Sequence, residues 1–191
     1  MVTEVSRKIY ILLTDTGTLF SRAIGLYTKA NLNHASIVLD EEMKEIYSFG
    51  RKNSFNPFNG GFVKEKVFGH LVREATRPTA CAIYSCTVSD DNYELLRARI
   101  QHMEQNQHQY KYNLLGLFGI VLNISIERKN AFFCTQFVAY MLQKHGVKLM
   151  MDKSLAQITP MDLQNCENLE LIYSGDLRER ARHQYAYPLT S

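Results

Sequence analysis

The segment that most constrains the fold of this chain is 130–146, an amphipathic stretch with one cysteine near its start. Apolar residues recur there every three or four positions, the spacing that places side chains on one face of a helix: Phe133, Phe137, Tyr140 and Met141. Asn130 is expected to cap the start of this helix, and Gly146 to be the left-handed residue after its end. Cys134 is therefore predicted to lie in the first helical turn.

The chemistry of Cys134 follows from that position. The first N–H groups of a helix have no partner within the helix and favour an anion, so a cysteine there is predicted to have thiolate character. The alternative is that Cys134 fills space in the core, because free cysteine is among the most buried residue types. The sequence has no CxxC pair and no Cys/His spacing typical of zinc, so the other cysteines are predicted to be reduced packing residues: Cys81, Cys86 and Cys166.

The rest of the chain predicts a mixture of strands and helices. Short apolar or alternating runs bounded by turn residues predict strands at 9–13, 34–40, 45–50, 62–68, 80–88 and 169–173. The second and third of these are expected to form a hairpin. Helices are predicted at 19–27 and after Ser89, where apolar residues form one stripe: Tyr93, Leu96, Ile100 and Met103. We therefore expect an α+β fold, with an antiparallel β-sheet packed against helices.

Composition narrows the classes of function. A chain of 191 residues with 46% apolar and 21% charged residues predicts a single globular domain over 1–191, with a charged surface tail at 176–191. The net charge of +3 comes from well-mixed signs, which argues against nucleic acid as a partner. We expect no cofactor and no metal.

Two apolar runs bear on targeting. The run 9–13 is too short for a signal sequence, and 114–122 is too short to span a membrane. A cytoplasmic protein without a transmembrane segment is therefore expected. The segment 114–122 fits either a helix or a strand, and peripheral membrane contact through it is left open.

A cysteine nucleophile needs a base within hydrogen-bonding reach and a third group that orients the base. His34 begins a predicted strand, and a polar residue on the returning strand of the hairpin can face it. The order along the chain is histidine, then the polar residue, then Cys134. Papain-type enzymes have the reverse order, with the cysteine first.

Three segments in this order resemble the circularly permuted branch of the NlpC-type papain-like superfamily: His34-Ala-Ser-Ile-Val-Leu-Asp40, Glu45-Ile-Tyr-Ser-Phe-Gly-Arg51 and Phe132-Phe-Cys-Thr-Gln-Phe-Val138. That branch includes YiiX-like bacterial proteins and the lecithin retinol acyltransferase group. The resemblance spans residues 9–146. It implies a permuted papain-like (NlpC-like) fold that carries a cysteine-hydrolase site.

The resemblance assigns roles to individual residues. Cys134 would be the nucleophile and His34 the general base. Relatives place His or Glu at the third position, which falls to Ser48 in this chain, with Glu45 as the charged alternative. Serine can accept the imidazole N–H bond, but it carries no charge to stabilise an imidazolium.

Further contacts with substrate are predicted around these groups. The Cys134 backbone N–H is expected to be one oxyanion donor, and either Tyr10 or Gln136 the second. Tyr47 and Arg51 are further candidates for substrate binding. The loop 51–61, rich in Asn, Pro and Gly, is either a lid over the site or an ordinary surface loop.

The predicted function is that of a cysteine hydrolase that cleaves an amide or ester bond through a thioester acyl-enzyme. Within the resembled family a peptidase or amidase acting on a cell-wall-type peptide is favoured. Lipid acyl transfer is the alternative chemistry, and it gains support if 114–122 lines an exposed apolar surface. A different class is a non-catalytic binding module that keeps the fold, as the uncharged Ser48 suggests. A metal site on Cys134 and His34 is a more distant alternative, since only two ligands are identified.

Overall fold

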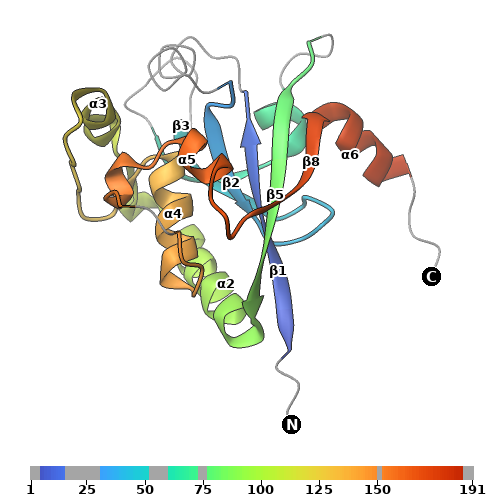
Figure 1. The fold of residues 1–191 in the computed structure, drawn as a ribbon, viewed down its shortest axis with the longest axis horizontal. Helices are drawn as coiled ribbons and strands as arrows, with labels where there is room; N and C mark the ends of the chain where they lie inside the picture. Colours follow the sequence, from blue (N-terminus) through green and yellow to red (C-terminus); the bar gives the residue numbers. More distant parts are fainter. Residues whose placement is uncertain (1–4, 16–30, 52–59, 73–76, 150–151, 187–191) are drawn as a thin grey trace.

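The computed structural model describes residues 5–15, 31–51, 60–72, 77–149 and 152–186. Its centre is a six-stranded antiparallel sheet in the order β4-β3-β2-β1-β5-β8 (Figure 1). These strands are β1 (Ser6–Thr14), β2 (His34–Val38), β3 (Ile46–Arg51), β4 (Gly60–Glu65), β5 (Ala80–Ser89) and β8 (Glu170–Asp176). A short parallel pair joins β6 (Lys111–Tyr112) to β7 (Ala131–Phe132). The predicted α+β class with an antiparallel sheet is confirmed.

Helices pack on both faces of this sheet. The longer helices are α2 (Asp90–Gln105), α3 (Leu114–Leu122), α4 (Cys134–Lys144), α5 (Pro160–Gln164) and α6 (Leu177–Ala186). Three short turns complete the described elements: η1 (Val67–Leu71), η2 (Gln107–Gln109) and η3 (Leu155–Gln157). Helices α2 and α4 lie against one face, whereas η1 and α6 lie against the other (Figure 1).

Alternation along β1 supplies both faces of the sheet with apolar side chains. Ile11 and Leu13 belong to the core beneath α2 and α4, together with Phe137. Leu12, one position away, belongs to the core beneath η1 and α6, together with Leu177. Successive residues of a strand point to opposite faces, so a fully buried central strand is apolar at almost every position.

The strands predicted at 9–13, 34–40, 45–50, 80–88 and 169–173 are confirmed by β1, β2, β3, β5 and β8. The strand predicted at 62–68 is shorter than expected. It ends at Glu65, and the chain then turns at Gly69, whose φ of 97° is the left-handed conformation that glycine adopts easily. The predicted helix 19–27 and residues 52–59 of the predicted loop lie outside the described residues, while Gly60 and Gly61 begin β4.

The predicted helix after Ser89 is confirmed, the segment left open at 114–122 is a helix, and most of the predicted tail is helical. The Ser89 side chain caps α2 by accepting from the Asn92 N–H, and the predicted apolar stripe of α2 is buried. Segment 114–122 forms helix α3. Residues 177–186 form helix α6 instead of a surface tail, because Leu177 and Ala181 are fully buried against the sheet.

The start of α4 differs from the prediction. Phe133 is the N-cap residue and has extended backbone geometry, whereas Asn130 lies in a turn with a φ of 54°. The intervening residues form β7, which pairs with β6 and keeps this part of the chain extended. The end of the helix follows the prediction, since Gly146 adopts a φ of 90°.

Candidate active site

Cys134 is the first residue of α4, and its side chain is buried, with 7% of the residue exposed. The N-cap residue, Phe133, makes no side-chain hydrogen bond to the first turn. The first N–H groups of a helix have no partner within the helix. A negative charge on Cys134, or on a substrate atom beside it, would therefore lie at the positive end of the helix dipole.

His34 is the first residue of β2, and the Cys134 thiol lies near enough to its ring to help raise the pKa of His34. The histidine is also well packed, with only 13% of its side chain exposed. Strand β2 therefore positions the base, and the first turn of α4 positions the thiol. The sequence predicted this pair, and the structure brings its two members together.

The second partner of His34 is Glu65, the last residue of β4. Its Oε1 lies 3.0 Å from His34 Nε2, and its Oε2 accepts a hydrogen bond of 2.6 Å from the Ser36 hydroxyl. Only 9% of the Glu65 side chain is exposed. Since Glu65 engages Nε2, Nδ1 is the ring nitrogen left to exchange a proton with Cys134.

The electrostatic interactions between His34 and Glu65 favour the charged form of both side chains. Burial alone would lower the pKa of His34, but the Glu65 charge and the hydrogen bonds to Cys134 and Glu65 outweigh it and raise this pKa to about 10. Burial alone would raise the pKa of Glu65, but the charge and hydrogen bond of His34 hold it below its usual value. The directions of these two shifts agree with a charged His34–Glu65 pair, which places a cation beside the Cys134 thiol.

Ser48 is not the partner of the imidazole. Ser48 is fully buried. It lies on the same side of the sheet as His34, since a Cβ placed on Gly50 would lie 3.9 Å from both Ser48 Oγ and His34 Cε1. Its hydroxyl contributes to the lowered pKa of Glu65, although its Oγ makes no hydrogen bond of good geometry. Ser48 therefore lines the buried carboxylate, and Glu65 fills the third position.

Glu45, the charged alternative from the sequence, lies elsewhere. Its Oε2 is 3.9 Å from an Arg97 guanidinium nitrogen, and its Oε1 accepts a long hydrogen bond of 3.4 Å from the Tyr47 hydroxyl. The prediction of either Ser48 or Glu45 as the third group was therefore wrong.

Gln136 lies in the first turn of α4, two residues after Cys134, and is 4% exposed. Its Oε1 accepts a hydrogen bond of 3.3 Å from Asn113 Nδ2. The structure thus keeps Gln136 near the thiol along the helix, and its role as an oxyanion donor stays a prediction.

Tyr10 and Tyr47, two other predicted contact residues, do not lie at this site. Tyr10 pairs with Val38, four positions along β2 from His34, and its hydroxyl donates to Glu41 at 2.7 Å. Tyr47 is buried in the core on the α2 and α4 side, where its ring stacks on that of Phe62. The side chain of Arg51 lies outside the described part of the chain.

Glu65 is the residue that sequence reasoning missed. It lies inside the strand run 62–68, which the sequence did predict, and alternation places it on the same side of the strand as the partly buried Val63. A carboxylate on the buried side of a strand requires a partner, and this was the available signal. The order of strands in the sheet places β4 next to the β2–β3 hairpin, and local sequence patterns do not predict this order.

The described residues contain no group of three or more His, Cys, Asp and Glu side chains that could hold a metal ion. Within the same ranges, no helix has the length and apolar content needed to span a membrane. The sequence matches no model of a known protein family and no curated protein.

Proposed function

We propose that the protein is a cysteine hydrolase or acyltransferase in which Cys134 is the nucleophile, His34 the base and Glu65 the positioning residue. The observation that carries this proposal is the continuous series of contacts from Cys134 through His34 to Glu65. A thiol, an imidazole and a buried carboxylate in this order are the parts that covalent thiol catalysis needs.

The reaction would begin from a thiolate and an imidazolium. The Cys134 sulfur attacks the carbonyl carbon of an amide or ester, and the resulting oxyanion is stabilised by N–H groups at the start of α4. His34 then gives its proton to the leaving nitrogen or oxygen as the carbon–heteroatom bond breaks, which leaves a thioester on Cys134. Neutral His34 next takes a proton from water or another acceptor, whose attack on the thioester releases the acyl product and restores the thiolate.

Glu65 has a distinct part in this scheme. Its hydrogen bond to Nε2 fixes the orientation of the ring, and its charge stabilises the imidazolium. The Ser36 hydroxyl holds the other carboxylate oxygen, so the carboxylate itself is oriented. Glu65 also supplies the charge that Ser48 lacks, which weakens the reason for the non-catalytic binding module.

Two substrate classes remain within the proposal. The resemblance to the permuted NlpC-type branch favours a peptide or amide of the cell-wall type. One structural observation favours lipid acyl transfer as the second candidate, because α3 carries apolar side chains that are more than half exposed: Leu115, Phe118 and Leu122.

The test is the rate at which iodoacetamide alkylates Cys134 as a function of pH, measured by mass spectrometry. We expect Cys134 to be alkylated much faster than an ordinary thiol at neutral pH, because the cationic His34 beside it assists its attack. His34→Ala should remove this advantage. Glu65→Gln should reduce it, since the imidazolium loses its counter-charge.

The protein provides its own controls. Burial raises the pKa of Cys86 to about 12, so this thiol should stay inert in every variant. Ser48→Ala should leave the profile of Cys134 close to that of the parent. Incubation with p-nitrophenyl acetate should then yield an acetyl adduct on Cys134. An unreactive Cys134, or a profile unchanged by His34→Ala, would overturn the proposal.

A further inference from the structure

The most conspicuous surface feature outside the candidate site is an exposed apolar cluster on α3 and at Ile124, two residues beyond its end. Nine large hydrophobic residues of the described chain are exposed, and four of them fall within 115–124. These four are Leu115, Phe118, Leu122 and Ile124, with exposed fractions of 55%, 55%, 65% and 52%. Single exposed apolar residues are ordinary, whereas a contiguous group marks an interaction surface.

The geometry of α3 shows why these side chains face outward. Leu115, Phe118 and Leu122 are spaced by three and four residues, so they form one stripe along the helix. The buried side carries Gly116 and Gly119, where a Cβ would lie 3.0 Å from the Ile126 carbonyl and 2.5 Å from the Ile124 carbonyl. The following segment thus packs closely on the glycine side and leaves the stripe uncovered by it.

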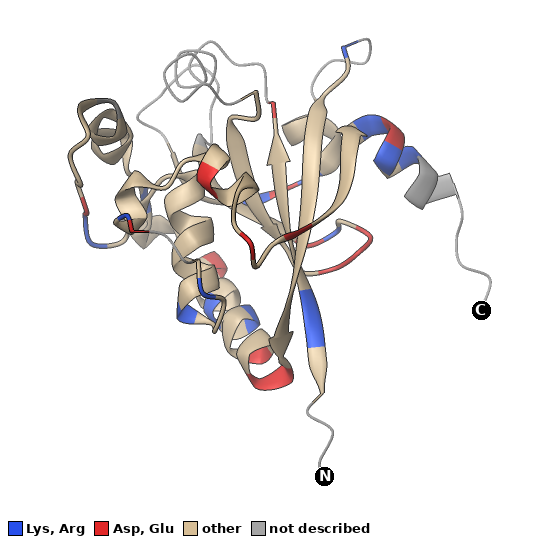
Figure 2. Ribbon diagram, viewed as in Figure 1, with Lys and Arg blue, Asp and Glu red and all other residues tan. Residues whose placement is uncertain are grey.

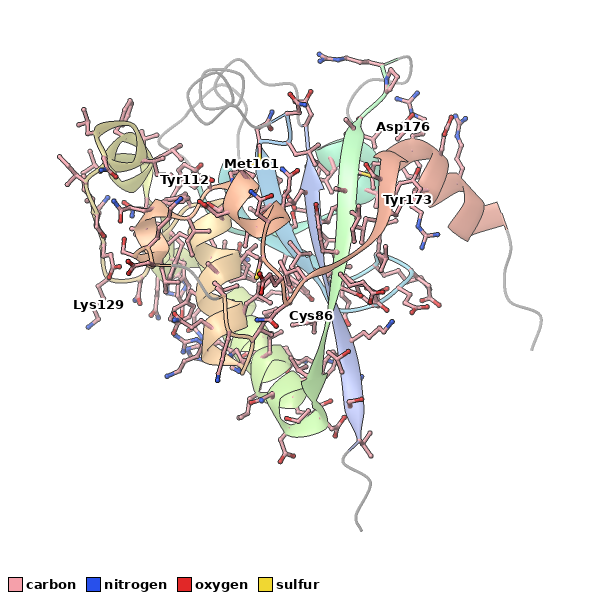
Figure 3. All side chains as sticks on the ribbon, in the orientation of Figure 1. Cys86, Tyr112, Lys129, Met161, Tyr173 and Asp176 are labelled. Atoms are coloured by element: carbon pink, nitrogen blue, oxygen red, sulfur yellow. The ribbon has the colours of Figure 1, made fainter. Side chains whose placement is uncertain are left out.

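Basic side chains lie on the segment that follows this apolar stripe. Figure 2 shows a basic stretch at the lower end of the chain that descends from α3, and Arg128 and Lys129 occupy this part of the sequence. Both are exposed, as is Lys111, whose backbone N–H donates to the Asn130 carbonyl in the same turn. Figure 3 shows Lys129 pointing away from the body of the molecule. Glu127 is the one acidic residue between α3 and this turn.

We propose that this edge, residues 114–129, docks on the surface of an anionic lipid bilayer. Leu and Phe side chains on one stripe would enter the boundary between headgroups and acyl chains, while Arg128 and Lys129 would contact anionic headgroups. A protein partner fits less well, because protein interfaces combine apolar contacts with regular hydrogen bonds. Segment 114–122 contains no polar side chain with which to make them.

The docking edge is joined to the candidate site by Asn113, which is fully buried. Its side chain caps α3 by accepting from the Gly116 N–H at 3.0 Å, and its Nδ2 donates to Gln136 on the first turn of α4. A protein docked through α3 would thus hold the start of α4 at a fixed position relative to the bilayer. Docking itself needs no chemistry at Cys134, so it stands or falls independently of the proposed function.

The test is co-sedimentation of the full chain with vesicles, using Cys134→Ser protein so that turnover plays no part. We expect binding to vesicles of phosphatidylcholine mixed with phosphatidylserine, and weaker binding to phosphatidylcholine alone. Phe118→Ser should lower the partition coefficient at least about tenfold, because half of a large apolar side chain no longer enters the bilayer. Arg128→Glu with Lys129→Glu should lower it about twentyfold or more on the anionic vesicles.

Matched variants keep the result specific. Phe68→Ser removes an aromatic residue of similar exposure from η1, and Lys148→Glu reverses an exposed charge elsewhere, so both should bind like the parent. Equal losses in Phe118→Ser and Phe68→Ser would overturn the proposal, as would the absence of binding to either kind of vesicle. The proposal would also be overturned if the protein did not bind vesicles but self-associated, and if Phe118→Ser abolished this self-association. The surface would then be an interface with a second copy of the chain.

Discussion

Helices α3 and α4 are both rich in apolar residues, yet they have opposite relations to solvent. Every residue of α4 from Cys134 to Ala139 is buried, and Phe137 packs against the rings of both Phe49 and Phe62. In α3 the stripe of Leu115, Phe118 and Leu122 faces outward. The difference teaches that apolar content does not decide burial, which depends on whether another element covers the helix.

The two helices also differ in what their N-termini do. Asn113 caps α3, and its side-chain oxygen accepts a hydrogen bond from the Gly116 N–H. Phe133 precedes α4 and offers no such oxygen, and Cys134 follows it directly. The capped helix is a surface element, and the uncapped helix presents its positive end to the proposed nucleophile.

The largest difference in stability between the two helices is expected for substitutions of Phe137 in α4 and Phe118 in α3. Phe137→Ala should lower the free energy of unfolding by about 3–5 kcal/mol, because it leaves a cavity in the core. Phe118→Ala should change it by no more than about 0.5 kcal/mol, since the side chain is already half exposed. Urea unfolding monitored by circular dichroism measures both. Similar losses in the two variants would show that α3 is covered in solution, and Phe137→Leu provides a milder core variant if Phe137→Ala does not fold.

The buried ion pair beside α4 predicts how stability depends on pH. Glu65→Gln removes a charge-assisted hydrogen bond to His34 and should cost about 2 kcal/mol near pH 6. The raised pKa of His34 contributes stability that is complete below about pH 6.5 and is lost as pH rises toward 10. The lowered pKa of Glu65 contributes stability that is present above about pH 4.5 and is lost as pH falls through its folded value.

The stability difference between parent and Glu65→Gln should therefore be largest between about pH 4.5 and 6.5 and shrink on both sides. Urea unfolding at a series of pH values measures this curve. A difference independent of pH would contradict a charged His34–Glu65 pair. Lys44→Gln serves as a control, because its contact with Glu42 is exposed and should contribute little at any pH.

The smallest effect is expected at the residue that joins the two helices. Asn113→Ala removes the cap of α3 and the hydrogen bonds to the Ile126 carbonyl and to Gln136, and should cost about 1–2 kcal/mol. The matched variant is Ser89→Ala, which removes only the cap of α2 and should cost about 1 kcal/mol. Thermal unfolding compares the two. A smaller loss in Asn113→Ala than in Ser89→Ala would mean that the link between α3 and α4 contributes no stability.

Much of the fold was predictable because local patterns are themselves physical causes. Alternation and apolar runs located five strands of the main sheet, and spacing located α2 and α4. The failures have physical reasons too. Charged residues predicted a surface tail at 176–191, but two small or apolar side chains, Leu177 and Ala181, are buried against the sheet within helix α6. The cap predicted at Asn130 was displaced by the pairing of β7 with β6.

The sequence by itself determined that a cysteine begins a helix and that a histidine begins a strand, because both follow from spacing over a few residues. Tertiary structure alone decided that the two side chains meet, and that the carboxylate beside them is Glu65. It also decided that α3 is a helix with an uncovered apolar stripe. Hydrogen bonds across a sheet join residues far apart in the chain, and burial depends on which other elements cover a surface, so neither is encoded in a local pattern.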